Sequence, residues 1–448
     1  MKKTVLIFTL TLASSFLVSQ ENYLPNREER VYALSLIWKE MLYNFAFPER
    51  LHEVNIDSLY KAYIPKVEQA KDFYEYYFIL SAFMAHFNDA HTRIIAPERP
   101  DDTPPLKLIN FGEKIFVSNV AKSLVDKIPL GSEIVKINNI PVAKYCNDSI
   151  LPYVAASTSH WRFDKAVSDM LLYGRPYSTI KITIKTLEGQ ENEIELVRNY
   201  NSEAAKEPMA DSNYVPPINI KMIDDDIGYI QLTSFLRPYL DTINAVFNDW
   251  LPQLRKCKGL IIDIRGNRGG TTQAWENIAY HLMSDTLFQT QGTYLSRHHI
   301  ATLKGWGEYN PQFRDFYNGT SMEKIYHSPY RNELPDSLKL HQPLIVISGY
   351  FVASASEFFL TLMKETNRAT IIGEPSVGTM SEPIFFPLPG GLEAMICAKK
   401  YISPDGTSSD ETGILPDIEV KRDYKDYLAG KDNVLERALE ELRRQIRK

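Results

Sequence analysis

The sequence predicts a multidomain α/β protein, with a helical region first, a β-rich module next and an α/β core with a mixed sheet last. Its 448 residues exceed what one ordinary hydrophobic core accommodates. Apolar residues at helical spacing fill 26–86, and short β-branched segments dominate 106–198. After residue 217 strands alternate with helices, which indicates a partly parallel sheet covered on both faces.

Residues 1–19 have the layout of a secretory signal peptide. Two lysines precede an apolar run, small residues follow it, and cleavage is expected after Ser19. The run is too short for a stable membrane span, and no later segment reaches that length. We therefore expect an exported protein, periplasmic or extracellular, without a membrane span. Residues 22–98 form the predicted N-terminal helical domain, which ends in the proline-rich linker APERPDDTPP.

The remaining domains follow from pattern changes along the chain. The β-rich domain is expected over 104–199 and the α/β core over 217–430. Residues 288–342 are long, aromatic and irregular, so we expect a lid or an insertion there. The tail, 431–448, is predicted to be an amphipathic helix with one apolar stripe: Val434, Leu435, Ala438, Leu439, Leu442 and Ile446.

Charge and cysteine content exclude some classes of function. The formal net charge is -6, the pI is near 5.9 and no basic cluster stands out, so we expect no nucleic-acid partner. The three cysteines, Cys146, Cys257 and Cys397, are widely and irregularly spaced. They are predicted to be buried thiols, with neither a disulfide framework nor a zinc site. We expect neither metal nor cofactor.

Two serines stand at a predicted strand-to-helix corner in LIVISGYFVASASEFFLTLMKE, which begins at Leu344. Such a corner exposes a side chain beside the free N–H groups of a helix N-terminus. Developing negative charge is stabilised there, which suits a nucleophile. Either Ser354 or Ser356 could fill that role. In the alternative interpretation, both serines only cap or pack the start of the helix.

A second corner is predicted in GLIIDIRGNRGGTTQAWENIAYHL, where Gly269 and Gly270 separate a strand from a helix. Paired glycines let the backbone approach a ligand closely, so one of their N–H groups is a candidate oxyanion donor. The alternative is a plain turn in which Asp263 and Arg265 form an internal salt bridge.

A serine nucleophile needs a base, and the stretch AHFNDAHTRI offers His86 and His91. His86 falls within an apolar-periodic helix, so we interpret it as a packed or partly exposed histidine. His91 lies beyond the helix, in a loop or at a strand edge, which suits a general base. By itself, a histidine in a loop is usually a surface residue.

Together these stretches resemble one family, the C-terminal-processing (tail-specific) peptidases with the tricorn core proteases, a clan of serine peptidases. VASASE matches its nucleophile motif, DIRGNRGG its D-[LF]-R-x-N-x-G-G block, and NDAHT the D-x-H-T block of the tricorn-like branch. LGSEIVKINNIPV resembles the family's PDZ module. The resemblance covers most of the chain from about Arg30 to Val420. It implies a PDZ-like domain over 104–199 and a crotonase-like peptidase core over 217–430.

The resemblance implies roles for individual residues. Ser354 becomes the nucleophile and Ser356 structural, while the backbone of Ala355 and a glycine of the Gly269–Gly270 pair supply the oxyanion hole. The Ser/Lys branch places its lysine 25 residues after the serine, where this chain has Thr379.

The tricorn-like branch instead implies His91 as the base, with an acidic residue just before G-[VI]-x-P-D. Asp410 and Glu411 are both candidates for that acidic residue. Ala90 replaces the serine that precedes the histidine in tricorn.

The sequence therefore predicts an exported serine endopeptidase that cleaves extended or unfolded polypeptides, including bonds near their C-termini. Its PDZ-like module is expected to bind peptide by strand addition. Thr379 and Ala90 favour an alternative, a non-catalytic peptide- or ligand-binding protein with the same fold. A further alternative is an esterase or deacylase that uses the same site. The sequence leaves the oligomeric state open.

Overall fold

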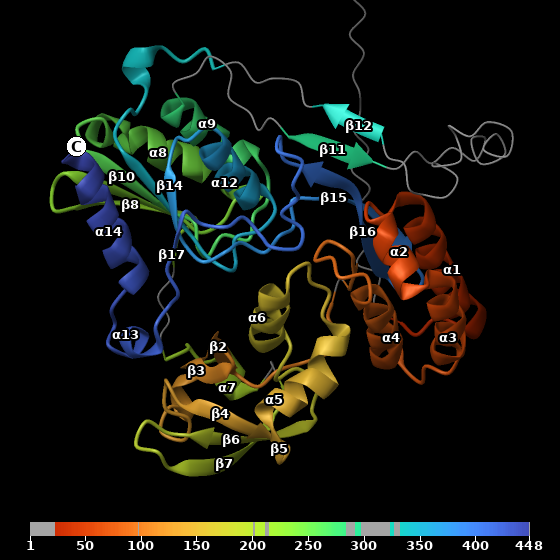
Figure 1. The fold of residues 1–448 in the computed structure, drawn as a ribbon. Helices are drawn as coiled ribbons and strands as arrows, with labels where there is room; N and C mark the ends of the chain where they lie inside the picture. The colour runs from red at the N-terminus through yellow and green to blue at the C-terminus, as the bar shows by residue number, and fades with distance from the viewer. Residues whose placement is uncertain are drawn as a thin grey trace, which may run out of the picture.

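The computed structural model describes residues 23–96, 98–199, 202–210, 215–283, 292–296, 323–326 and 332–447. The predicted signal peptide lies outside the described residues, as does most of the predicted lid at 288–342. The described residues form three sheets with surrounding helices, which confirms the predicted multidomain α/β class (Figure 1).

The N-terminal region is helical. A capping box starts its first helix, because Asn26 Oδ1 accepts the Glu29 N–H at 2.9 Å and the Glu29 carboxylate accepts the Asn26 N–H at 3.0 Å. Burial of aromatic and aliphatic side chains between the helices stabilises the region. The helices are α1 (Arg27–Asn44), α2 (Pro48–Val54), α3 (Ile56–Glu68) and α4 (Phe73–Ala85).

This helical core is completed by strands from the other end of the chain. Leu388, Ala394 and Ile396 of the β15–β16 hairpin pack among the helices. Strand β1, which follows α4, pairs antiparallel with β16. The segment between α4 and β1 is therefore fixed against the C-terminal half of the chain. The sheet contains β1 (Arg93–Ile95), β11 (Thr293–Ser296), β12 (Glu323–Tyr326), β15 (Glu382–Leu388) and β16 (Leu392–Ile402).

The β-rich module has strand order β2-β3-β4-β6-β7, with β5 beside β4. Alternating apolar residues of its strands form a core with α6. Strand β2 is an edge strand, and α6 packs beside it through a hydrogen bond between Asn110 and Asp164. The elements are β2 (Leu106–Phe111), β3 (Lys114–Val120), β4 (Glu133–Ile137), β5 (Ile140–Pro141), α5 (Val142–Tyr145), α6 (Ser159–Asp169), β6 (Thr179–Lys185) and β7 (Glu191–Val197), with α7 (Glu203–Lys206) after them.

The α/β core is built on a six-stranded sheet of order β17-β14-β13-β10-β9-β8. Only the β8–β9 pair is antiparallel among these described strands, so the sheet is mixed, as predicted. The strands are β8 (Ile218–Ile223), β9 (Ile227–Leu232), β10 (Gly259–Asp263), β13 (Leu344–Ser348), β14 (Thr370–Gly373) and β17 (Ile418–Glu419).

Helices cover both faces of this sheet (Figure 1). Leu260 and Ile262 face α8, α9 and α12, whereas Ile261 between them faces α14 on the other side. Helix α14 buries Val434, Ala438 and Leu442, which confirms the predicted apolar stripe of the tail. The helices are α8 (Leu240–Leu254), α9 (Gln273–Leu282), α12 (Ala355–Glu365), α13 (Tyr424–Leu428) and α14 (Asn433–Ile446).

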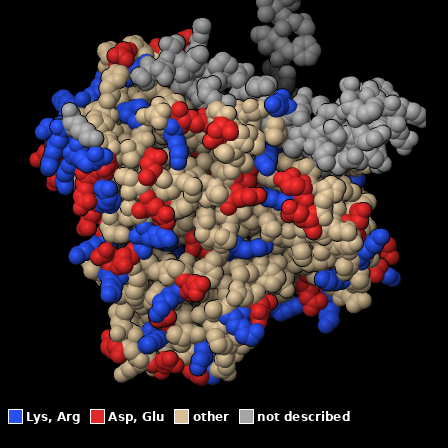
Figure 2. Space-filling model, viewed as in Figure 1, with Lys and Arg blue, Asp and Glu red and all other residues tan. Residues whose placement is uncertain are grey.

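All three cysteines are free and buried, as the sequence predicted. Acidic and basic side chains are interspersed over the face seen in Figure 2, with a basic group at the left, where α14 lies. No helix in the described part of the chain is long and apolar enough to cross a bilayer.

Candidate active site

Ser354 stands at the corner between β13 and α12 in an unusual backbone conformation. Its φ of 55° and ψ of -121° are strained for a residue that carries a side chain. Such conformations cost about 1–3 kcal/mol and persist only where surrounding contacts impose them. One of those contacts is a 3.1 Å hydrogen bond from the Ser354 N–H to Glu357 Oε2.

The fully buried Glu357 carboxylate connects this corner to the segment 376–381. Its two oxygens accept hydrogen bonds from the Ser376 hydroxyl at 2.5 Å, the Gly378 N–H at 2.7 Å and the Thr379 N–H at 2.8 Å. Burial raises the pKa of Glu357, while these donors oppose the shift. Sequence analysis gave Glu357 no role, although its S-x-x-E spacing from Ser354 is typical of a capping box.

The second corner, between β10 and α9, touches the first. A Cβ placed on Gly269, whose φ is 88°, would lie 2.5 Å from the Ala353 carbonyl oxygen and 3.0 Å from both Ser354 Cβ and the Ala355 nitrogen. A Cβ on Gly270 would lie 2.2 Å from the Phe235 carbonyl oxygen. No side chain fits at either position, and the two glycines allow the corners to meet.

Asn267 determines which polar groups at this junction remain available. Its buried Oδ1 accepts hydrogen bonds from the Gly269 N–H at 2.9 Å and from the Ser356 hydroxyl at 2.8 Å. Ser356 is fully buried and its hydroxyl is engaged there, whereas Ser354 is partly exposed. Within the described residues, no hydrogen-bond acceptor is found for the N–H groups of Gly270 and Ala355.

Asp263 and Arg265 of the glycine-containing motif belong to a structural ion-pair network. Arg265 pairs with Asp263 at 2.7 Å and with Asp432, at the start of α14, at 2.8 Å. The Tyr229 hydroxyl also donates to Asp263, at 2.7 Å. The internal salt bridge considered from the sequence is therefore present, and it coexists with the close approach of the glycines to Ser354.

His91 lies between α4 and β1, with Nδ1 2.7 Å from the Ser381 carbonyl oxygen. A carbonyl only accepts, so Nδ1 carries the proton and Nε2 of the neutral ring is left as an acceptor. Burial lowers the pKa of His91, Arg93 lowers it further, and Asp89 and the Ser381 carbonyl oppose the shift. His86 instead ends α4 on the surface and bonds to the Ala82 carbonyl oxygen at 2.7 Å.

Asp89 is a residue whose role sequence analysis did not identify. It is fully buried and accepts hydrogen bonds from the hydroxyls of Thr92 at 2.5 Å and Ser157 at 3.5 Å. Ser157 also accepts the Ala90 N–H at 3.0 Å, so the β-rich module supports the histidine loop. The D-x-H-T spacing contained this residue, but its partner Ser157 is distant in sequence.

The two acidic candidates differ in environment. Asp410 is 2% exposed, and its carboxylate accepts a hydrogen bond from the Ser408 hydroxyl. Burial and the nearby charge of Asp89 raise the pKa of Asp410 to about 7, while the Ser408 bond opposes the shift. Glu411 is exposed. Burial therefore separates two neighbours that the sequence pattern did not distinguish.

The segment 376–381 is where these groups converge. It donates hydrogen bonds to the Glu357 carboxylate from Ser376, Gly378 and Thr379, and its Ser381 carbonyl oxygen accepts the hydrogen bond from His91 Nδ1. Helix α6 of the β-rich module also rests on it, because Thr158 Oγ1 donates to the Val377 carbonyl oxygen at 3.0 Å. Among the described residues, no hydrogen bond joins His91 directly to Ser354. The structure brings both residues to this segment.

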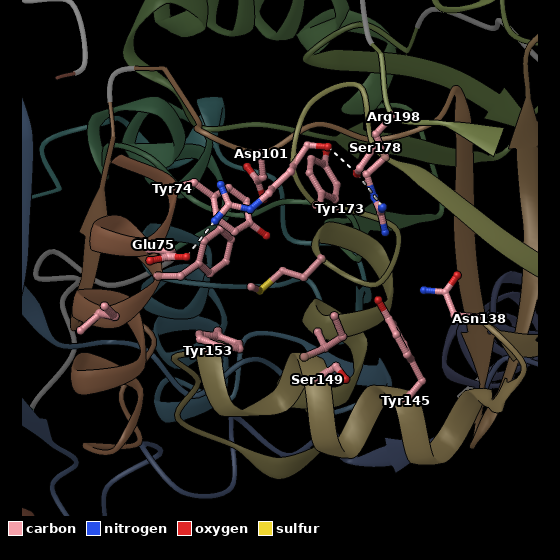
Figure 3. A pocket seen from close by; sticks show the side chains of 16 residues that line it. Tyr74, Glu75, Asp101, Asn138, Tyr145, Ser149, Tyr153, Tyr173, Ser178 and Arg198 are labelled. Carbon is pink, nitrogen blue, oxygen red and sulfur yellow. Dashed lines mark hydrogen bonds and ion pairs between the residues drawn. The ribbon is translucent and has the colours of Figure 1, made fainter. Parts of the chain in front are cut away.

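A separate cavity of about 640 Å³ lies between α4 and the β-rich module (Figure 3). Aromatic rings line it from both sides, including Tyr74 of α4 and Tyr145 and Tyr153 of the module. Arg175, which also lines the cavity, pairs with Glu75 at 3.2 Å. Its lining contains none of the predicted catalytic residues.

The described residues also contain no cluster of histidine, cysteine, aspartate and glutamate suited to hold a metal ion.

Residues 226–420, which carry both corners, match the family model described as peptidase family S41. This part of the chain is similar to peptidase family S41. Two solved structures share the fold of this chain. Mature CPAF complexed with lactacystin has a TM-score of 0.66 at 12% identity, with 89% of this chain and 95% of that chain covered. The photosystem II D1 C-terminal processing protease has a TM-score of 0.50 at 17% identity, with 88% of this chain and 93% of that chain covered.

Curated proteins similar to this chain include a carboxy-terminal-processing protease of Bartonella bacilliformis, 27% identical over 215 residues. Carboxy-terminal processing protease CtpB of Bacillus subtilis is 24% identical over 205 residues. These matches cover 48% and 46% of this chain but only 43% and 36% of the two relatives. A carboxyl-terminal-processing protease of Picosynechococcus is 24% identical over 361 residues, 79% of this chain and 75% of the relative.

Proposed function

We propose that this protein is a serine endopeptidase that cleaves extended or unfolded polypeptides, including bonds near their C-termini. The main support is the close approach of the β10–α9 and β13–α12 corners. There Gly269 contacts Ser354, and the N–H of Ala355 has no acceptor among the described residues. The match of the core to peptidase family S41 and its similarity to carboxy-terminal processing proteases support the same reaction.

In the proposed mechanism, Ser354 Oγ attacks the peptide carbonyl carbon while His91 Nε2 accepts the hydroxyl proton. The oxyanion of the tetrahedral intermediate accepts hydrogen bonds from the Ala355 N–H, at the N-terminus of α12, and from the Gly270 N–H, at the β10–α9 corner. His91 then transfers its proton to the leaving amine, and the C–N bond breaks to leave an acyl-enzyme. Water, deprotonated by His91, hydrolyses that ester and restores Ser354.

The environment of His91 supports it as the base. The Ser381 carbonyl selects the tautomer with a basic Nε2, and the lowered pKa keeps the ring neutral at neutral pH. Thr379 stands where the Ser/Lys branch has its lysine, and its N–H is bonded to Glu357. A lysine base is therefore not part of the proposal.

For the acidic helper we propose Asp410 in place of Glu411. Asp410 is buried and within the influence of Asp89, which itself acts on the charge of His91. Above its pKa of about 7, Asp410 is a carboxylate, and its negative charge can stabilise the imidazolium that forms during the reaction. The exposed Glu411 has no comparable position.

We also propose that the β-rich module is PDZ-like and binds substrate by strand addition. Edge strand β2, with α6 beside it, supports this role, because an extended peptide can pair with an exposed strand.

We further propose that residues 1–19 direct export of the protein and are then removed. A mature chain that lacks these residues, observed by N-terminal sequencing of the exported protein, is the expected result.

The proposed function is tested by mass spectrometry of an unfolded protein incubated with the enzyme. Wild type is expected to release internal fragments, and Ser354→Ala to release none. A panel of small esters run in parallel distinguishes an esterase, which cleaves the esters and leaves the polypeptide intact. Absence of any turnover, with a folded wild-type enzyme, contradicts the proposal and favours a non-catalytic binding protein.

A further inference from the structure

Three cations from separate parts of the chain meet beside the proposed nucleophile. Arg93 begins β1, two residues after His91, and Arg268 directly precedes Gly269. Lys165 projects from α6 of the β-rich module. Asp169, at the end of α6, is the carboxylate they share. We call Arg93, Lys165 and Arg268 the cation cluster.

Asp169 does not neutralise the cation cluster. It lies 3.4 Å from Lys165 Nζ and 3.4 Å from a guanidinium nitrogen of Arg268. No carboxylate among the described residues lies within ion-pair distance of the Arg93 guanidinium. The cluster thus carries three positive charges around one shared carboxylate, and the other nearby acid, Asp89, is buried against two hydroxyls.

The cations also disfavour one another's charge. Burial lowers the pKa of Lys165 to about 8, and Arg93 and Arg268 act in the same direction against the opposing Asp169. Burial and the charge of Arg268 likewise lower the pKa of Arg93, although this residue is exposed to solvent. Like charges held together in partly desolvated surroundings do not stabilise the fold, so such clusters point to a functional site.

Aromatic packing positions the cluster toward the serine corner. The Arg268 guanidinium lies 4.7 Å from the centre of the Phe351 ring and 5.7 Å from that of Trp161. Phe351 is three residues before Ser354, and its ring packs edge-on against Trp161 at 5.6 Å. The side chain of Lys165 is 18% exposed and that of Arg268 is 52% exposed, so a ligand can reach both.

We propose that the cation cluster is a subsite that binds a carboxylate of the substrate polypeptide beside the bond attacked by Ser354. This inference rests on the proposed function. Guanidinium and ammonium groups bind carboxylates through short, charge-assisted hydrogen bonds. Arg268 adjoins Gly269, which touches Ser354, so the carboxylate belongs to a residue within about three positions of the scissile bond in an extended chain.

Two sources supply the same carboxylate chemistry: an aspartate or glutamate side chain, or the α-carboxylate of the chain end. Peptides cleaved at one known bond distinguish them. One series carries glutamate or glutamine at each position within three residues of that bond, and another ends in a free acid or an amide. A preference for glutamate assigns a side-chain subsite, and a preference for the free acid assigns a chain-end subsite.

The expected result is that wild type prefers the carboxylate-bearing peptide of one pair by about tenfold or more in kcat/KM. Lys165→Met is expected to lower this ratio below about threefold, and Lys165→Glu to lower it further or reverse it. Lys144→Met is the matched control, because Lys144 also pairs with an aspartate four residues later but lies outside the cluster. It is expected to keep the wild-type ratio.

A binding measurement separates failure of this subsite from failure of the proposed function. Fluorescence anisotropy gives Kd for the same labelled peptides with Ser354→Ala, with and without Lys165→Met. If no peptide is hydrolysed but the carboxylate preference in Kd depends on Lys165, the subsite stands and the proposed function fails. Equal kcat/KM and equal Kd for every pair, or a preference that survives Lys165→Met, overturn the subsite.

Discussion

The two strand-to-helix corners of the core reach the same junction by different means. At the β10–α9 corner, Gly269 and Gly270 are explained by packing alone, because any Cβ there would collide with backbone atoms. At the β13–α12 corner, a serine takes a strained conformation that glycine would adopt without cost. Packing accounts for the first corner, whereas the Ser354 side chain has a capping-box role at the start of α12. The difference supports the proposal that the Ser354 hydroxyl is the nucleophile.

The largest expected effect comes from exchanging the residue at the strained corner. Ser354→Ala and Ser354→Gly are both expected to lower kcat/KM about 10³-fold or more, because each removes the nucleophile. Ser354→Gly is also expected to raise the free energy of unfolding by about 1 kcal/mol, since it relieves the strain. Peptide hydrolysis and denaturant unfolding measure the two quantities.

Ser356→Ala is the control for this exchange. Loss of its buried bond to Asn267 is expected to cost about 1–3 kcal/mol of stability while most activity remains. The opposite pattern, with Ser356→Ala inactive and Ser354→Ala active, would contradict the assignment of the two serines.

The next effect concerns the base. His91→Ala is expected to lower kcat/KM about 10²-fold or more. In wild type, kcat/KM should rise with pH through the pKa of His91, because only the neutral ring accepts a proton. Burial lowers that pKa, so the rise is expected below about pH 6.5, the ordinary value for histidine.

His86→Ala, at the exposed end of α4, is the matched control and should leave both the rate and the pH profile unchanged. A pH profile that keeps its acidic limb in His91→Ala would show that another group is the base.

The glycine corner is tested by adding one methyl group. Gly269→Ala is expected to lower kcat/KM about 10²-fold, because its Cβ would meet the Ala353 carbonyl 2.5 Å away and displace the oxyanion donors. Gly266→Ala is the matched control, since its Cβ would meet no atom within 4 Å. Equal activity of the two variants would mean that close contact of the corners is unnecessary for turnover.

A smaller effect distinguishes the two acidic neighbours. Asp410→Asn is expected to lower kcat/KM about tenfold, and Glu411→Gln less than about twofold. A tenfold loss with Glu411→Gln alone would reassign the acidic helper.

The pH dependence of the free energy of unfolding gives an independent test of the raised pKa of Asp410. The folded protein holds the Asp410 proton up to about pH 7, whereas the unfolded chain releases it near pH 4. Ionisation of Asp410 therefore reduces stability progressively as pH rises between these values. Asp410→Asn removes this loss, so its free energy of unfolding relative to wild type should increase by about 4 kcal/mol from pH 4 to pH 8.

Local patterns in the sequence predicted what depends on neighbours along the chain. The apolar stripe of α14, the buried strands before Asp263 and Ser354, and the three buried thiols were all readable from spacing and composition. The PDZ-like module and the residue roles came from resemblance to a family.

Features that depend on distant partners could not be predicted. The helical region shares its core with Ala394 and Ile396, some 300 residues later, and Asp89 bonds to Ser157 of another module. Asp410 and Glu411 are adjacent, and only the fold decides which is buried. Glu357 was visible as a capping residue, but its bonds to the segment 376–381 required the structure.

The most direct test of Ser354 as the nucleophile is the position of a covalent adduct. Wild-type protein is treated with a fluorophosphonate, digested and sequenced by tandem mass spectrometry. A single phosphonylated residue at Ser354, lost in His91→Ala and kept in Ser356→Ala, is the predicted result. An adduct on Ser356, or a folded protein with no adduct at either serine, would contradict it.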